Sequence, residues 1–149
     1  MTKRIENTSS PTYSGEINFS HTSILIVDDE TSCLHSLKRL LESFGANVTS
    51  ARNGKTALQI LEDKVFSLII LDIMMEDMDG WDIYGTIRQD LQDHDVPILF
   101  YSGLIDEKHA EFLNAGPLQK SYIVSKTSSP PELLTSISRL LHSEQPTLC

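Results

Sequence analysis

The chain has 149 residues, of which 40% are hydrophobic and 22% charged, a balance typical of one folded domain with its own core. Its 12 Lys and Arg face 21 Asp and Glu, and the net charge of −9 argues against direct binding of nucleic acid. The 2 cysteines form no disulfide framework or zinc spacing, and apolar runs of about five residues are too short to cross a bilayer. No secretory signal is recognisable either, so we expect a cytoplasmic protein.

Short apolar runs mark the predicted strands. Residues 1–22 are rich in Ser, Thr, Asn, Pro and Gly, and are predicted to form a flexible N-terminal extension. Beyond them, runs such as Leu68–Leu71 lack any alternation of apolar and polar residues, which is typical of strands buried on both faces of a parallel sheet. The predicted strands cover residues 23–27, 46–51, 67–71, 97–101 and 122–125.

Helical patterns fill the intervals between these strands. Thr31 is the predicted N-cap of the first helix, and Gly45 is expected to end it in a left-handed conformation. In the last helix, Ser129 and Glu132 have the spacing of a capping box, and Pro130 occupies the first helical position. The helices between these two are predicted from Ala57, Leu58 and Leu61 after a cap at Asn53, from Ile83, Ile87 and Leu91, and from Ala110 with Leu113.

The alternation of five strands with helices predicts an α/β fold. Its expected form is a five-stranded parallel sheet with helices on both faces. We assign residues 23–142 to this domain and residues 143–149 to a polar C-terminal tail. Since one domain uses up the chain, we expect its output to come from another protein.

Polar side chains follow four of the predicted strands, where an open parallel sheet binds its ligands. Asp28 and Asp29 follow the first strand, Asp72 the third, Ser102 the fourth and Lys126 the fifth. Three converging carboxylates repel one another unless a cation neutralises them, and oxygen ligands without thiols favour Mg²⁺. A lysine and a hydroxyl beside them suit phosphoryl oxygens. The set indicates phosphoryl transfer with a carboxylate nucleophile.

Four segments at these strand ends resemble the receiver domain of two-component response regulators, a flavodoxin-like (βα)5 fold. The resemblance covers roughly residues 23–142 and is specific because all four segments occur in order. These segments are ILIVDDE at 24–30, LDIMMEDMDG at 71–80, YSG at 101–103 and VSK at 124–126.

The resemblance implies a role for each matching residue. Asp72 would accept a phosphoryl group from a phosphohistidine on a histidine kinase or phosphotransfer protein. Asp29 and Asp72 would bind Mg²⁺ directly, Asp28 mostly through water, and Met74 through its backbone carbonyl.

Further roles concern the phosphoryl group and the output. Ser102 and Lys126 would hold the phosphoryl oxygens, with Ser102 moving inward, and the small Gly103 would leave the site open to its donor. The resemblance implies a stand-alone signalling protein that phosphorylates and dephosphorylates only itself. It would act through contacts with a downstream protein and, when phosphorylated, as a possible homodimer, without membrane insertion.

The chain departs from the family pattern at three positions. Glu76 stands where the family usually has proline, which adds negative charge and frees the loop. Thr127 replaces the proline after the lysine, and we expect a trans bond there because a cis bond before a non-proline residue costs roughly 2.5–4 kcal/mol. Ile123 replaces the usual aromatic, a role that the neighbouring Tyr122 could take only through a register shift of one residue.

Two other functions fit parts of the sequence. The chain could instead be a receiver that is not phosphorylated and acts only as a binding module. The replacements at Glu76 and Thr127 leave this alternative open. A Mg²⁺-dependent aspartyl phosphohydrolase of the haloacid-dehalogenase type would need Asp-x-Asp after the first strand, where this chain has adjacent aspartates. Cys33 and Trp81 are interpreted as packing residues, and the 5 histidines show no ligand spacing.

Overall fold

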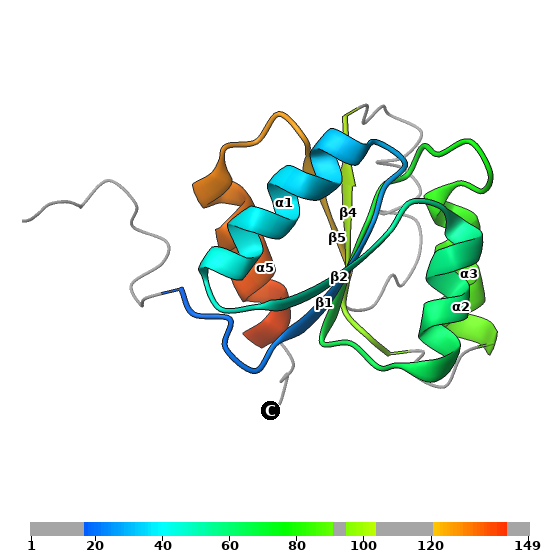
Figure 1. Ribbon diagram of the computed structural model, residues 1–149, viewed down its shortest axis with the longest axis horizontal. Helices are drawn as coiled ribbons and strands as arrows, with labels where there is room; N and C mark the ends of the chain where they lie inside the picture. Colours follow the sequence, from blue (N-terminus) through cyan, green and yellow to red (C-terminus); the bar gives the residue numbers. More distant parts are fainter. Residues whose placement is uncertain (1–16, 91–94, 104–120, 143–149) are drawn as a thin grey trace, which may run out of the picture.

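The computed structural model describes residues 17–90, 95–103 and 121–142. Within them, five parallel strands form one sheet in the order β2-β1-β3-β4-β5. Helices α1 and α5 cover one face of this sheet, and α2 and α3 cover the other (Figure 1). The predicted α/β fold is confirmed. The elements are β1 (Ser23–Val27), α1 (Thr31–Ser43), β2 (Asn47–Ala51), α2 (Gly54–Asp63), β3 (Leu68–Leu71), α3 (Gly80–Asp90), β4 (Ile98–Ser102), β5 (Ser121–Ser125) and α5 (Pro130–His142).

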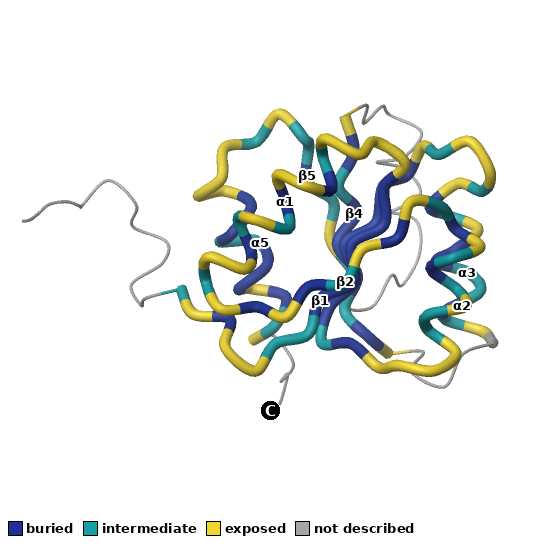
Figure 2. Tube along the Cα trace, in the orientation of Figure 1, coloured by how far each residue is buried: buried dark blue, intermediate teal, exposed yellow. Residues whose placement is uncertain are grey.

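The central strands are buried on both faces, which accounts for their unbroken apolar runs. Every residue of β3 is buried, as are the last four of β1, whereas the edge strand β2 contains exposed, intermediate and buried positions. Figure 2 shows this buried centre between the two helix layers. The parallel pairing of β1 with β3 ends at Val27 and Leu71, so the next residues, Asp28 and Asp72, leave the sheet side by side.

Packing begins before the first strand. Phe19 is only 2% exposed, its ring centroid lies 6.3 Å from that of Phe44, and its backbone N–H donates to the carbonyl of Phe44 at 2.7 Å. Ile17 packs against the same core. Residues 17–22 therefore depart from the predicted flexible extension, because burying an aromatic ring outweighs the polar composition around it. The expectations for residues 1–16 and 143–149 lie outside the described residues.

Three of the predicted helix ends are confirmed. Gly45 follows α1 with a φ of +98°, in the left-handed region that glycine favours. The side chain of Asn53 caps α2 by accepting a hydrogen bond from the backbone N–H of Thr56 at 2.8 Å. At the start of α5, the backbone N–H of Ser129 donates to Oε1 of Glu132 at 2.9 Å. These local signals are satisfied within a few residues, so they can be predicted from sequence.

The cap predicted at Thr31 is wrong. Thr31 is the first residue of α1, and its N-cap is Glu30, whose side chain makes no capping hydrogen bond. The carboxylate of Glu30 instead lies 3.6 Å from Nζ of Lys126, and its backbone N–H donates to Oδ1 of Asp28 at 2.9 Å. For the side chain of Glu30, a charged contact with the distant Lys126 thus replaces a local cap.

The remaining expectations differ only in detail. Strand boundaries move by one residue at several ends; β4, for example, runs to Ser102 and β5 begins at Ser121. The expected helix around Ala110 and Leu113, and the apolar position Leu91, lie outside the described residues. Within the described part, no helix has the length and apolarity needed to cross a membrane.

Candidate functional site

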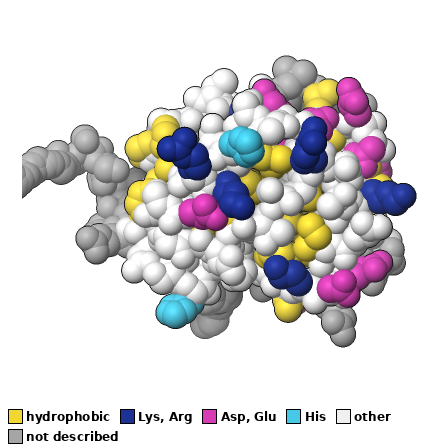
Figure 3. All heavy atoms as spheres, viewed as in Figure 1, with side chains coloured by type: hydrophobic (Ala, Val, Ile, Leu, Met, Phe, Trp, Pro, Cys, Tyr) yellow, Lys and Arg dark blue, Asp and Glu magenta, His cyan; other side chains and the backbone are white. Residues whose placement is uncertain are grey.

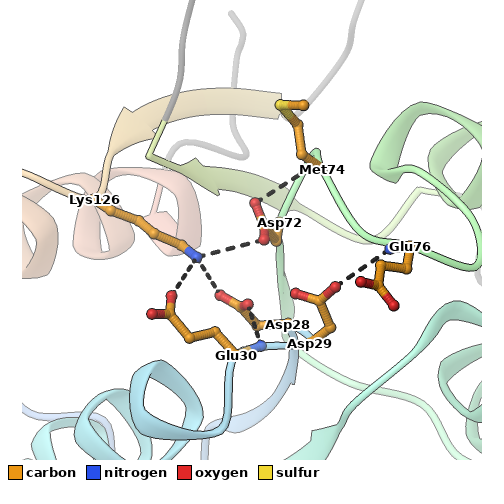
Figure 4. Close-up of polar contacts among 7 residues, drawn as sticks. All are labelled: Asp28, Asp29, Glu30, Asp72, Met74, Glu76 and Lys126. Carbon is orange, nitrogen blue, oxygen red and sulfur yellow. Dashed lines mark hydrogen bonds and ion pairs between the residues drawn. The ribbon is translucent and has the colours of Figure 1, made fainter.

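Charged side chains from three strands meet at the carboxyl edge of the sheet (Figure 4). Asp28 and Asp29 follow β1, Asp72 follows β3, and Lys126 follows β5. The parallel arrangement brings them together because every strand ends at the same edge. The structure therefore joins four of the residues that the sequence singled out.

The three aspartates form a cluster that suits a cation. One carboxylate oxygen from each of Asp28, Asp29 and Asp72 lies within 4.8 Å of the others. Asp28 and Asp72 are 4% and 6% exposed, whereas Asp29 faces solvent. Hard oxygen donors with one open side fit a divalent cation such as Mg²⁺, which prefers carboxylates and retains several water ligands. The donor set is thus compatible with the predicted metal.

Lys126 holds the buried side of this cluster. Its Nζ lies 2.6 Å from Oδ2 of Asp28 and 3.4 Å from Oδ2 of Asp72, with Glu30 farther out at 3.6 Å. Burial lowers the pKa of Lys126, but the hydrogen bond and negative charge of Asp28 outweigh burial and raise the pKa above its usual value. Lys126 is therefore a permanent cation beside Asp72.

Asp72 is harder to ionise than an ordinary aspartate. Its burial, and next the negative charge of Asp28, raise the pKa of Asp72 from 3.8 to about 6, although Lys126 opposes the shift. A cation bound between the aspartates would favour the ionised form. The charge of Asp72 therefore depends on its burial, on Asp28 and on Lys126.

The loop between β3 and α3, residues 72–79, carries both Asp72 and Glu76. Within it, the backbone N–H of Met74 donates to Oδ1 of Asp72 at 3.4 Å, and that of Glu76 donates to Oδ2 of Asp29 at 3.3 Å (Figure 4). The family that this sequence resembles usually has proline at position 76, and proline has no N–H to donate. The replacement therefore adds a contact between the loop and the cluster.

The end of this loop, at Asp79 and Gly80, is a structural turn. Oδ1 of Asp79 accepts from the backbone N–H of Asp82 at 3.0 Å at the start of α3. A side chain at position 80 would place its Cβ 2.6 Å from the carbonyl oxygen of Asp72, so the close approach requires glycine. The turn fixes the far end of the loop against the residue that follows β3.

Ser102 lies at the carboxyl end of β4, as predicted, and is 1% exposed. Its backbone carbonyl accepts a hydrogen bond from the N–H of Lys126 at 2.8 Å, which ties the two strand ends together. Among the described residues, a Cβ at Gly103 would meet only Cδ of Lys126, at 3.9 Å.

Strand β5 does not make the register shift that would give Tyr122 the role of the missing aromatic. Tyr122 pairs with Leu99 and is 46% exposed, whereas Ile123 packs against the core beneath α2 and α3. Tyr122 and Val124 point to the opposite face, since side chains alternate along a strand. The described part contains no cis peptide bond, in agreement with the trans bond expected before Thr127.

Cys33 and Trp81 both pack near the site. The thiol of Cys33 is half-buried, and its pKa rises to about 12, chiefly through burial and next through its hydrogen bond to Asp28. Sequence reasoning identified Cys33 only as a packing residue, because no motif reveals this contact. The ring centroid of Trp81 lies 4.5 Å from that of Phe100, which supports its interpretation as packing.

Comparisons with known proteins agree with this geometry. The family model of the response regulator receiver domain matches residues 24–138. The chain is 36% identical over 126 residues to a protein named "probable transcriptional regulator ycf27" from Cyanophora paradoxa, covering 84% of this chain and 51% of that protein. It spans about half the length of the curated relatives it matches.

Solved structures give the same result at the level of the fold. A CheY-like receiver domain protein from Methanospirillum hungatei superposes with a TM-score of 0.72 at 31% identity, covering 82% of this chain and 94% of that one. The response regulator TrrA from Thermotoga maritima, solved in complex with Mg²⁺ and BeF, gives a TM-score of 0.69 at 28% identity, covering 80% and 98%. This chain therefore belongs to the response regulator receiver domain family of two-component systems.

Proposed function

We propose that this receiver domain accepts a phosphoryl group on Asp72 from a phosphohistidine of a histidine kinase or phosphotransfer protein. A carboxylate oxygen of Asp72 attacks phosphorus, the P–N bond breaks, and the leaving imidazole takes up a proton. The observation that carries this proposal is the cluster of three aspartates within 4.8 Å with Lys126 beside Asp72. The likeness to TrrA, whose structure holds Mg²⁺ and BeF, supports it.

Each site residue has a proposed task. Asp29 and Asp72 would hold Mg²⁺ directly, the Met74 carbonyl would be a third protein ligand, and Asp28 would act mostly through water. The ion, when bound, offsets the negative charge of the aspartates and of the phosphoryl oxygens. Lys126 and Ser102 would bind the phosphoryl oxygens. To do so, the ammonium group of Lys126 would have to move away from Asp28, which it now contacts at 2.6 Å.

The output of the phosphorylated domain is also a proposal. We infer a stand-alone cytoplasmic protein that has no separate substrate, signals through a downstream protein and forms a homodimer when phosphorylated. Since the curated relatives are about twice as long as this chain, an additional domain is the main alternative route of output. Measuring the size of the native polypeptide in cell extract, and what co-purifies with it before and after phosphorylation, distinguishes the two routes.

The phosphoryl-transfer step is tested with acetyl phosphate and Mg²⁺, read by intact mass. We expect one added phosphoryl group on the wild type and none on Asp72→Asn, and Asp79→Asn serves as a matched control on the same loop. Equal phosphorylation of Asp72→Asn would reject Asp72 as the acceptor. A wild type that gains no group with acetyl phosphate or with a phosphorylated kinase would favour a phosphorylation-independent binding module. Sustained release of phosphate from an added ester would favour a phosphohydrolase.

A further inference from the structure

We propose that Asp77 is a positioning residue, which holds the β3–α3 loop in place by capping helix α2 from outside. The inference rests on the proposed function, because this loop carries Asp72 and the Met74 carbonyl. It assigns a task to an exposed side chain that is not among the proposed ligands or phosphoryl contacts.

The contact joins residues that are far apart in sequence. Both carboxylate oxygens of Asp77 accept from the backbone N–H of Gly54, at 3.2 and 3.1 Å, and one also accepts from that of Lys55 at 3.3 Å. These are the first two N–H groups of α2, which have no partner within the helix. A carboxylate at a helix N-terminus is further favoured by the helix dipole.

Two side chains, those of Asn53 and Asp77, accept hydrogen bonds from the N–H groups in the first turn of α2. The local cap, Asn53, accepts from the N–H of Thr56 at 2.8 Å, and the first helical hydrogen bond runs from Ala57 to the carbonyl of Asn53 at 3.1 Å. The two N–H groups before Thr56 are those bound by Asp77. Asp77 thus completes a cap that the helix itself leaves unfinished.

Packing at Gly54 supports the same close approach. A Cβ at this position would lie 2.9 Å from Sδ and 3.1 Å from Cβ of Met78, the residue after Asp77, and 3.1 Å from Cδ1 of Ile83. A side chain at Gly54 would therefore crowd Met78 and Ile83, so the loop and the helix are in close contact here. Two independent features, one polar and one steric, bring the loop and the helix together.

An anchor at Asp77 matters because the two hydrogen bonds between this loop and the aspartates are long. The N–H of Met74 reaches Asp72 at 3.4 Å and that of Glu76 reaches Asp29 at 3.3 Å, both near the limit for hydrogen bonds. The proline that usually stiffens this loop in the family is absent. Asp77 follows Glu76 directly, so its attachment to α2 limits how far the Met74–Glu76 segment can move from the aspartates.

The decisive variant is Asp77→Ala, and Asn53→Ala is its matched control, because it removes a cap from the same helix without touching the loop. Hydrogen exchange of the metal-free proteins, measured for peptides covering residues 72–79, reads the loop directly. We expect Asp77→Ala to raise the exchange rate at Met74 and Glu76 by about tenfold, the size of one lost charged cap. Asn53→Ala should affect α2 and leave the loop nearly unchanged.

Mg²⁺ titration, followed by the fluorescence of the single Trp81, gives a second measure. The apparent Kd should rise several-fold in Asp77→Ala, remain near wild type in Asn53→Ala, and be largely restored in Asp77→Asn, which retains an acceptor oxygen. Gly54→Ala should reproduce the loop exchange of Asp77→Ala, and provides the test should Asp77→Ala fail to fold. Equal loop exchange in Asp77→Ala and Asn53→Ala would overturn the proposal.

Failure of this inference can be told apart from failure of the proposed function. The exchange experiment needs neither metal nor phosphoryl donor, so it judges Asp77 even if Asp72 takes up no phosphoryl group. Conversely, normal phosphorylation of the wild type with unchanged loop exchange and Mg²⁺ affinity in Asp77→Ala would reject the positioning role alone.

Discussion

The two sides of the aspartate cluster are built on different physical principles. On the buried side, the carboxylates of Asp28 and Asp72 share the Lys126 ammonium, and the shorter contact, to Asp28, is 2.6 Å long. On the β3–α3 loop side, the exposed carboxylates of Asp29 and Asp77 are held by neutral backbone N–H groups. The first side is partly neutralised by a fixed positive charge, whereas the carboxylates of the second side contact only neutral donors among the described residues.

This difference indicates where each ligand would bind. The buried side already contains a cation, so it suits the phosphoryl oxygens once Lys126 turns from Asp28. The loop side has no lysine or arginine among the contacts described for Asp29, and its carboxylate faces solvent. A hydrated divalent cation is best accommodated there. Figure 3 shows Lys and Arg side chains spread among acidic ones on the visible face.

The largest expected effect is that of removing the fixed cation. Lys126→Met leaves Asp28 and Asp72 buried without their partner, and should lower the metal-free free energy of unfolding at pH 8 by about 3 kcal/mol. Millimolar Mg²⁺ should restore part of this loss. Denaturant unfolding measures both effects, and Lys38→Met, which loses only a surface pair with Glu42 at 3.9 Å, is the control. Equal losses in the two variants would contradict a neutralising role for Lys126.

A smaller effect of opposite sign is expected from Asp72→Asn. Because the pKa of Asp72 is raised to about 6, the folded metal-free protein binds this proton more tightly than the unfolded chain. The stability contribution of Asp72 therefore falls as the pH rises from about 4 to about 6. Asp72→Asn removes this dependence and, at about 1.4 kcal/mol for each unit of the pKa difference, should be more stable by at most about 3 kcal/mol above pH 6.

Thermal or urea unfolding of both proteins across this pH range, without metal, gives the difference directly. The free energies of unfolding of the two proteins should be similar near pH 4 and should differ increasingly as the pH rises. Mg²⁺ should reduce this difference, because it stabilises mainly the wild type. A constant difference at all pH values would mean that Asp72 titrates as an ordinary aspartate.

The smallest effect is expected from Glu30, at the exposed rim of the aspartate cluster. Glu30 has a side chain that is 60% exposed, and it lies 3.6 Å from Nζ of Lys126. Glu30→Gln should change the free energy of unfolding by less than about 0.5 kcal/mol, because water screens exposed pairs. Salt titration of the variant and wild type checks this; a loss comparable with that of Lys126→Met would show that this exposed pair contributes as much to stability as the buried contacts of Lys126.

Local sequence signals predicted the fold well because their physics is local. The unbroken apolar run Leu68–Leu71 reports a strand buried on both faces, and the caps at Asn53 and Ser129 bind N–H groups a few residues away. The strand ends were predicted for the same reason, since each of Asp28 and Asp72 directly follows an apolar run. A parallel sheet then requires these ends to meet.

The failures involve residues whose environment comes from distant parts of the chain. Glu30 caps α1 without a side-chain hydrogen bond while its carboxylate faces Lys126, and Phe19 is buried against Phe44 in spite of its polar surroundings. The register of β5 keeps Tyr122 exposed, although one residue of slip would have reversed its face.

The order of strands and helices and the family could be predicted from the sequence alone, because apolar periodicity and motifs can be recognised along the chain. The meeting of the carboxylates and the lysine at one edge of the sheet could also be predicted, because each of them follows a recognisable strand. Only the tertiary structure decided how these charges are shared: Lys126 with Asp28 more closely than with Asp72, and Asp77 with the N-terminus of α2. The physical reason is that ion pairs and helix caps depend on distances between residues that are remote in sequence, which only packing fixes.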